Sequence, residues 1–232
     1  MSENQIVMRY FMNLKEELKQ RVTGDRMAMR IIVMVLACTL MGLGISFYAH
    51  AAMGSDPCST MNLGLAKFLG KNLGPVMVST NIVLLIFVVI FDRSMLGLGT
   101  IGNMVLCGFT SDFFNIFLDK LLPPTADMSI SFRVLLTLIG VVIQLLGISF
   151  YITADLGMAP YDCIPYIIEE KTHFNFRVVR VIWDWAFVAV GFFFGASVGI
   201  GTIIMCFCIG PIIPILNKHV AGPLLKAENI RA

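Results

Sequence analysis

Long apolar stretches alternate with short polar segments along this chain. Six stretches approach the length of about 20 mainly apolar residues that a membrane-spanning helix needs. They cover roughly residues 30–52, 76–92, 98–118, 131–154, 178–196 and 199–217. The pattern predicts an all-α membrane protein, a polytopic helical bundle with six transmembrane helices.

Two of the polar segments are long enough to hold a helix of their own. SDPCSTMNLGLAKFLGKN separates the first and second stretches, and MAPYDCIPYIIEEKTHF separates the fourth and fifth. Proline favours the first turn of a helix, so Pro57 and Pro160 each predict the start of a helix of about 12–14 residues. A helix of that length is too short to span a bilayer, and we expect it to lie in the interface or to enter partway.

The composition agrees with a membrane protein. Hydrophobic residues make up 57% of the chain and charged residues 14%, and the mean hydropathy is +0.84. A soluble protein of this length needs a charged surface that such a composition does not supply. The lipid bilayer is therefore the expected partner, and no basic run interleaved with aromatic residues suggests nucleic acid.

The positions of lysine and arginine predict the orientation. With six spans and a cytoplasmic N-terminus, 13 of these residues lie inside and four lie outside, in agreement with the positive-inside tendency. Eight spans would place 16 inside and one outside, so charge leaves this alternative open, and the length of the short helices favours six. Residues 1–29 are predicted to form a cytoplasmic amphipathic segment, and residues 218–232 a cytoplasmic tail.

The sequence also repeats itself at a spacing of 103 residues. The pentapeptide GISFY occurs at Gly44–Tyr48 and again at Gly147–Tyr151. The same shift places Gly54 on Gly157, Pro57 on Pro160 and Asn81 on Asp184, and one residue of slip then places GLGT at 97–100 on GIGT at 199–202.

These matches predict a tandem duplication. Residues 30–122 would form repeat 1 and residues 123–217 repeat 2, each with three transmembrane helices and one short helix after a Gly-x-x-Pro turn. Because three is an odd number of spans, the second repeat would be inverted relative to the first. Inverted repeats recur among secondary transporters, which bind their substrates near the bilayer midplane where the repeats meet.

The order Gly-x-x-Pro, short helix, span and Gly-x-Gly-Thr resembles bacterial membrane proteins of the YczE/YyaS/YitT type, over roughly residues 30–217. GMAPYD at 157–162 is similar to their Gly-x-x-Pro-aromatic-Asp pattern, and GIGT at 199–202 to their Gly-x-Gly-Thr. The first copy departs from the pattern, with Asp56 before Pro57 and Cys58-Ser59 in place of aromatic-Asp. The resemblance implies a multi-pass protein of the bacterial inner membrane and supplies no catalytic residue.

Asp184 is the strongest candidate for a site residue. It lies in the fifth apolar stretch, where an ionisable group is costly unless it is paired and is by default a functional candidate. Arg180 stands four residues before it, the spacing of a same-face pair, so a purely structural ion pair is the alternative. Asn81 occupies the matching position of the first repeat, and both repeats are therefore expected to point a polar group at a shared interior.

Further candidates lie around the two Gly-x-x-Pro turns. Asp56 and Asp162 are expected either to cap the short helices or to stand where helix N-termini attract an anion. Gln144, in the middle of the fourth stretch, is expected to bond across helices or to line a cavity. The remaining candidates for the solute path are Ser55 and Tyr161 beside the turns, and Thr100 and Thr202 as caps of the helices after the Gly-x-Gly-Thr segments.

From these features we expect a small-solute secondary transporter or permease with its site between the two repeats. The alternative is a non-catalytic membrane subunit that captures a substrate for a larger complex or regulates one, and the assembly is left open as a homodimer or a larger membrane complex. The sequence holds no nucleophile with a base, no phosphate-binding loop and no paired-carboxylate site, so we expect no enzyme. No cofactor and no metal ion are expected.

Overall fold

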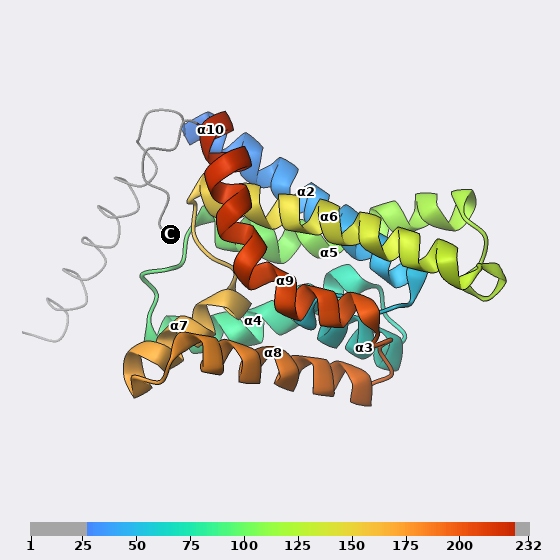
Figure 1. Ribbon diagram of the computed structural model, residues 1–232. Coiled ribbons are helices and arrows are strands. Elements are labelled where there is room, and N and C mark those ends of the chain that lie inside the picture. The colour runs from blue at the N-terminus through green and yellow to red at the C-terminus, as the bar shows by residue number, and fades with distance from the viewer. Residues whose placement is uncertain (1–26, 226–232) are drawn as a thin grey trace, which may run out of the picture.

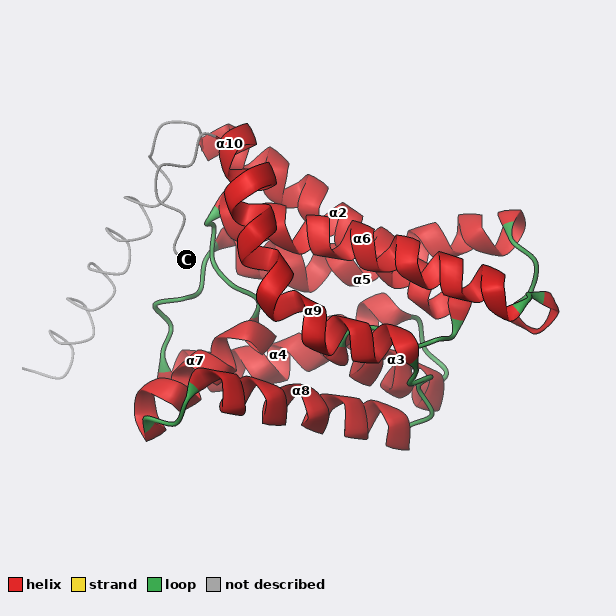
Figure 2. Cartoon of the chain, in the orientation of Figure 1, coloured by secondary structure: helices red, strands yellow, loops and turns green. Residues whose placement is uncertain are grey.

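A computed structural model describes residues 27–225, and every regular element in this range is a helix (Figure 2). The helices are α2 (Met27–Ala51), α3 (Pro57–Leu69), α4 (Leu73–Phe91), α5 (Leu98–Leu121), the 3-10 turn η1 (Thr125–Asp127), α6 (Ile130–Ala154), α7 (Pro160–Thr172), α8 (Phe176–Phe193), α9 (Ile200–Leu216), the π-helical turn η2 (Asn217–Ala221) and α10 (Gly222–Leu225). The predicted amphipathic segment lies almost entirely outside the described residues.

Helices occupy all six apolar stretches, but they differ in how well they suit a bilayer. Four of them, α2, α4, α5 and α6, are long and apolar enough to span it. The fifth stretch forms α8, which has 18 residues but includes the charged residues Arg177, Arg180 and Asp184. The sixth is bent by 63° between Ile200–Phe207 and Ile212–Ala221, and this bent pair would count as a fifth span. The protein is thus an all-helical membrane protein with four clear spans, and six spans stay a prediction.

The end of the chain remains helical beyond the predicted start of the tail. A π-helical turn and a short α-helix carry the chain from α9 to Leu225. Asn217 and Ala221 are buried on this extension, while Lys218 and His219 are exposed. Lys218 and His219 therefore lie on the outer face of a helix, and residues 226–232 of the predicted tail fall outside the described part.

Two groups of helices make up the structure (Figure 1). α2 packs most extensively against α6 and α5, while α3, α4, α7 and α8 pack against one another. α4 joins the groups through its contact with α5, and α9 lies against α6 and also touches α3 and α8.

Small residues bring α2 and α6 close together in an antiparallel pair. A Cβ added to Gly44 would lie 3.1 Å from the carbonyl oxygen of Gly140, and one added to Gly147 would lie 3.0 Å from that of Ala37. Residue numbers thus fall on α6 as they rise on α2. Gly44 and Gly147 are the first residues of the two GISFY segments, so the repeated glycines let the two backbones approach, as small residues do between membrane helices.

The two short helices have the predicted length and start. α3 and α7 are each 13 residues long and have proline in the first turn. Both end at a residue in the left-handed conformation, Gly70 with φ 60° and His173 with φ 57°. Such a residue commonly terminates a helix by offering its N–H to the free carbonyls of the last turn.

Glycines also form the crossing of α3 and α8. A Cβ on Gly191 would lie 2.5 Å from the carbonyl oxygen of Thr60, and Gly64 of α3 faces the Gly191 backbone in turn. The crossing of α4 and α7 instead buries Val88 and Ile167, which stand 103 residues from Gly191 and Gly64. Glycine at these two matching positions, where the other crossing has valine and isoleucine, explains why α3 and α8 have the closer contact.

Replacing Gly191 with alanine should therefore destabilise the protein. The added methyl group meets backbone atoms that cannot rotate away, and overpacking of this kind costs about 1–3 kcal/mol. The measurement is the midpoint of thermal unfolding in detergent. Gly102→Ala is the matched control, because its Cβ would meet only the flexible side chain of Met34. Equal midpoints for the two variants would contradict the prediction.

Candidate functional site

A charged network joins α7 and α8 around Arg180. Its Nη1 donates to Oδ1 of Asp162 at 2.8 Å, and its Nε lies 3.1 Å from Oδ1 of Asp184. The hydroxyl of Tyr161 donates to the same carboxylate of Asp184. The guanidinium also lies over the Tyr161 ring, 5.1 Å from its centroid. One guanidinium thus bridges two carboxyl groups from different helices.

This arrangement bears on two of the sequence predictions. The pair of Arg180 and Asp184 is present as the spacing predicts. Asp162, however, does not cap its helix: α7 begins after Ala159, which makes no side-chain cap bond, and Asp162 lies in the first helical turn. From there its carboxylate points to Arg180 of the neighbouring helix. Capping is therefore the wrong interpretation for Asp162, because proline at 160 moves the cap position three residues upstream.

Aromatic side chains cover this network and link it to α3. The Tyr161 ring lies 4.8 Å from that of Phe187, which in turn lies 4.6 Å from that of Trp183. Met61 and Cys58 of α3 pack into the same cluster. The first turns of α3 and α7 therefore share one core, beside the charges of α8.

A second polar cluster lies at the start of α3. Oδ2 of Asp56 accepts from the backbone N–H of Ser59 at 3.0 Å, which confirms capping for this aspartate. Its Oδ1 accepts from Nε2 of Gln144 at 2.9 Å, so the predicted interhelical bond of Gln144 is present and runs from α6 to the α3 cap. Ser55 bonds the hydroxyl of Thr60 at 2.9 Å and thereby fixes the turn.

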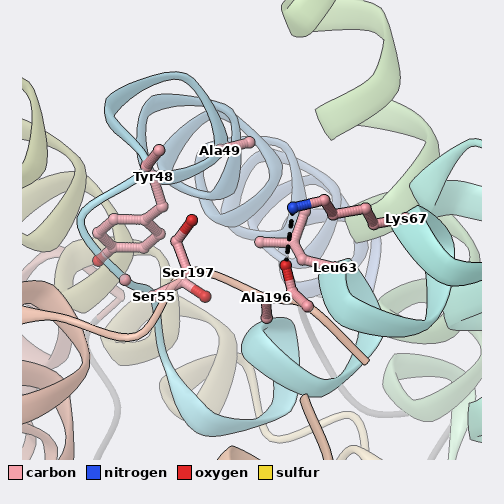
Figure 3. Close-up of a pocket in the computed structure, with 10 residues that line it drawn as sticks. Tyr48, Ala49, Ser55, Leu63, Lys67, Ala196 and Ser197 are labelled. Carbon is pink, nitrogen blue, oxygen red and sulfur yellow. Dashed lines mark hydrogen bonds between the residues drawn. The ribbon is translucent and has the colours of Figure 1, made fainter. Parts of the chain in front are cut away.

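A pocket of about 290 Å³ lies beside this second cluster. Tyr48 and Ser55 line it, together with Lys67 of α3 and the segment Gly195–Ser197 (Figure 3). Nζ of Lys67 donates to the carbonyl oxygen of Gly195 at 3.0 Å, which ties α3 to the loop before α9. The pocket is partly open, so Ser55 marks a point where the polar cluster approaches the surface.

Asn81 is buried as expected but makes a different contact. Its amide nitrogen donates to the carbonyl oxygen of Met77, one turn back on α4, at 2.9 Å. Within residues 27–225 no hydrogen bond links Asn81 to Asp184. The polar positions that the sequence matches across the repeats are thus both buried, while only Asp184 belongs to the charged network.

The Gly-x-Gly-Thr segments pack on the Gly-x-x-Pro turns. The N–H of Gly99 donates to the carbonyl oxygen of Leu156 at 2.7 Å, and the N–H of Gly201 donates to that of Met53 at 3.0 Å. Thr100 caps its helix by accepting from the Gly97 N–H, and it donates to the carbonyl oxygen of Met158. The hydroxyl of Thr202 is buried without a hydrogen-bond partner among the described residues, so the predicted cap is present only at Thr100.

Valine at these two threonines should therefore have unequal effects. Thr100→Val removes bonds of 3.0 and 2.7 Å and leaves a buried N–H and a carbonyl unpaired, at a cost of about 1–3 kcal/mol. Thr202→Val removes a hydroxyl that has no partner and keeps the shape, so its cost should be about zero. Thermal unfolding midpoints of the two variants test this, and a larger loss for Thr202→Val would contradict it.

Sequence reasoning missed Tyr48 and Lys67. Tyr48 belongs to the first GISFY, whose apolar and small residues were expected only to pack. Its hydroxyl is nevertheless buried with no partner in the described part of the chain, and its side chain lines the pocket. The signal was present, because a tyrosine recurs at Tyr151 in an otherwise apolar segment. Lys67 carried no signal, since its contact with Gly195 joins residues 128 positions apart.

Comparison with known proteins places the chain among bacterial membrane proteins. A Haemophilus influenzae protein named "Uncharacterized protein" is 28% identical over 192 residues, covering 82% of this chain and 84% of its own. The Bacillus subtilis proteins "Uncharacterized membrane protein YczE" and "Uncharacterized protein YyaS" are each 27% identical, covering 75% and 78% of this chain and 79% and 90% of theirs.

These relatives confirm the resemblance that the Gly-x-x-Pro and Gly-x-Gly-Thr segments indicated. No solved structure matches the chain. The "Family of unknown function (DUF6198)" matches residues 28–218. The chain is therefore a member of the DUF6198 family of membrane proteins.

Proposed function

We propose that this protein is a secondary transporter or permease for a small solute, with its site between two inverted halves. The observation that carries the proposal is the charged network of Asp162, Arg180 and Asp184, which lies beside the first turns of both short helices. Charged groups inside an apolar bundle are costly and mark substrate or ion pathways when they occur in membrane proteins. Sites where short helices end near the interface of two repeats are typical of transporters.

Three contacts support an inverted duplication. α2 and α6, which match each other in the sequence repeat, cross antiparallel, as an inverted duplication requires. The bond from Gly99 to Leu156 and the bond from Gly201 to Met53 are the same contact made once in each direction between the halves. The donors Gly99 and Gly201 stand 102 residues apart, and the acceptors Met53 and Leu156 stand 103 apart. These are the two spacings at which the sequence repeats itself. Both halves would thus present one short helix to a common interior.

The two halves differ at one pair of matching positions, which supports alternating access. Ser55 and Ser197 line the open pocket. Their counterparts in the repeat, Met158 and Met95, pack instead into the core of α4 and α7, where the Met158 N–H donates to the Met95 carbonyl oxygen at 3.0 Å. One end of the proposed path is therefore open and the other is filled, as expected for a single state of a transporter.

The proposal is tested with purified protein and a panel of small solutes. A solute that raises the unfolding midpoint and enters vesicles containing the protein would support it. Stoichiometric co-purification of another membrane protein would contradict the proposal if no solute stabilised either the isolated protein or the complex. That result would favour a capture or regulatory subunit.

We further propose the bacterial inner membrane as location, with both termini cytoplasmic. This orientation predicts that Lys71, in the link between α3 and α4, lies outside. Lys71→Cys in a chain freed of other reactive cysteines should react with a membrane-impermeant maleimide in intact cells. Labelling only after the cells are opened would contradict this orientation.

A further inference from the structure

Asp56 differs from Asp184, the other buried acid among the described residues, in having no positive charge against it. Its residue is 7% exposed, and within residues 27–225 no ion pair includes it. Arg180 is already bound to Asp162 and Asp184. The carboxylate of Asp56 accepts hydrogen bonds from the Ser59 N–H and from the side-chain amide of Gln144. Buried charges in proteins are normally paired, so this carboxylate calls for a positive group.

Two neighbouring oxygen atoms also lack partners. Gln144 is 2% exposed, and while its nitrogen bonds Asp56, its Oε1 has no hydrogen-bond partner in the described part of the chain. Tyr48 is 1% exposed and its hydroxyl is equally unpartnered. Both side chains lie at the close crossing of α2 and α6, Gln144 against Gly44 and Tyr48 against Gly140.

The pocket gives this cluster a route of entry. Tyr48 itself and Ser55, the residue before Asp56, are among its lining residues (Figure 3). Lys67 also lines it, but it stands 11 residues further along α3, about 16 Å at 1.5 Å per helical residue. Its ammonium group donates to the carbonyl oxygen of Gly195 at 3.0 Å, and among the described residues it makes no ion pair with Asp56.

The chemistry of these atoms selects the ligand. A carboxylate, an amide oxygen and a phenol oxygen are acceptors, and an ammonium group offers three donors to such a set. Hard metal cations take the same oxygen ligands. An anion would meet the Asp56 charge. Arg133 donates to the carbonyl oxygens of Ala51 and Ala52, and Lys67 donates to that of Gly195, so both basic side chains near the pocket are already engaged and an anion is disfavoured.

We propose that Asp56, Gln144 and Tyr48 form a cation-binding site that is entered through the pocket beside Ser55. The cation is either an alkali metal ion or the ammonium group of a solute, and the two share the positive charge and the need for oxygen acceptors. The inference rests on the proposed transport function, for which it supplies the substrate or the coupling ion.

Thermal unfolding of the purified full-length protein tests the site. NaCl or methylammonium chloride replaces N-methyl-D-glucamine chloride at constant ionic strength, and we expect a saturable rise of the midpoint. A rise with sodium alone assigns a metal ion, and a rise with methylammonium alone assigns an ammonium group. No rise with either cation would overturn the proposal.

Matched variants locate the effect. Asp56→Asn retains a cap for the Ser59 N–H, because asparagine caps helices as well as aspartate does, and it should weaken cation binding at least tenfold. Tyr48→Phe removes one acceptor and should weaken it less. Asp119→Asn, a carboxylate whose side chain is 69% exposed, should leave it unchanged. Equal binding by Asp56→Asn and the wild-type protein would also overturn the proposal.

The site and the transport function can fail separately. Solute uptake without saturable cation binding would remove this site and leave the transporter. Saturable binding that depends on Asp56, without uptake of any solute, would retain the site and remove the transporter.

Discussion

Asp184→Asn should abolish solute uptake while leaving folded protein in the membrane. Asparagine has the shape of aspartate and can still accept from the Tyr161 hydroxyl through Oδ1. Arg180 keeps its 2.8 Å contact with Asp162, so the guanidinium is not left unpaired. The variant removes one negative charge from the proposed path and little else, and the loss should therefore fall on transport.

Uptake of a stabilising solute into vesicles is the measurement, with vesicles lacking protein as the baseline. A single symmetric peak in size-exclusion chromatography and an unfolding midpoint close to that of the wild type would establish that the variant folds. Asp119→Asn is the control for loss of a carboxylate outside the network. Uptake at the wild-type rate by Asp184→Asn would remove the charged network from the solute path.

Arg180→Met, in contrast, should destabilise the protein and reduce the amount of folded protein in the membrane. It leaves Asp162 and Asp184 close together without a counter-charge, and it also removes the cation over the Tyr161 ring. Removing one partner of a buried ion pair costs about 3–5 kcal/mol. Most of this cost should come from Asp184, whose side chain is 9% exposed, rather than from Asp162 at 37%.

The double variant Arg180→Met with Asp184→Asn tests this explanation. Because it removes both members of the buried pair, its midpoint should lie above that of Arg180→Met alone. Subtracting the destabilisation of both single variants, Arg180→Met and Asp184→Asn, from that of the double variant gives the coupling energy of the two residues, as in a double-mutant cycle. A midpoint for Arg180→Met equal to that of the wild-type protein would show that the network carries no stability.

Local patterns in the sequence predicted much of the fold. The apolar stretches predicted the long helices, and proline in each polar segment predicted where the two 13-residue helices begin. The bend in α9 was not expected, although Pro211 lies at its centre and a proline inside a helix removes a backbone hydrogen bond. α8 has the length of the predicted stretch, but its three charged residues keep it from being counted among the clear membrane spans.

The candidate site was predictable only where its contacts are local. Arg180 and Asp184 stand one helical turn apart, so their pair could be read from spacing. The bonds from Arg180 to Asp162 and from Gln144 to Asp56 depend on how separate helices pack, and the second joins residues 88 positions apart. No periodicity in the sequence contains that information. The same holds for the pocket, whose lining joins residues between Tyr48 and Lys67 to the distant segment Gly195–Ser197.

The reciprocal turns also constrain the order of assembly during synthesis. The carbonyl of Met53 meets its donor only when Gly201 has been made, 148 residues later. α3 likewise waits for α8, against which it packs through Gly64 and Gly191. A nascent chain that ends before α8 therefore enters the bilayer with a short helix that lacks its main packing partner. The first half can insert early, but its folding is completed only after the last long helix leaves the ribosome.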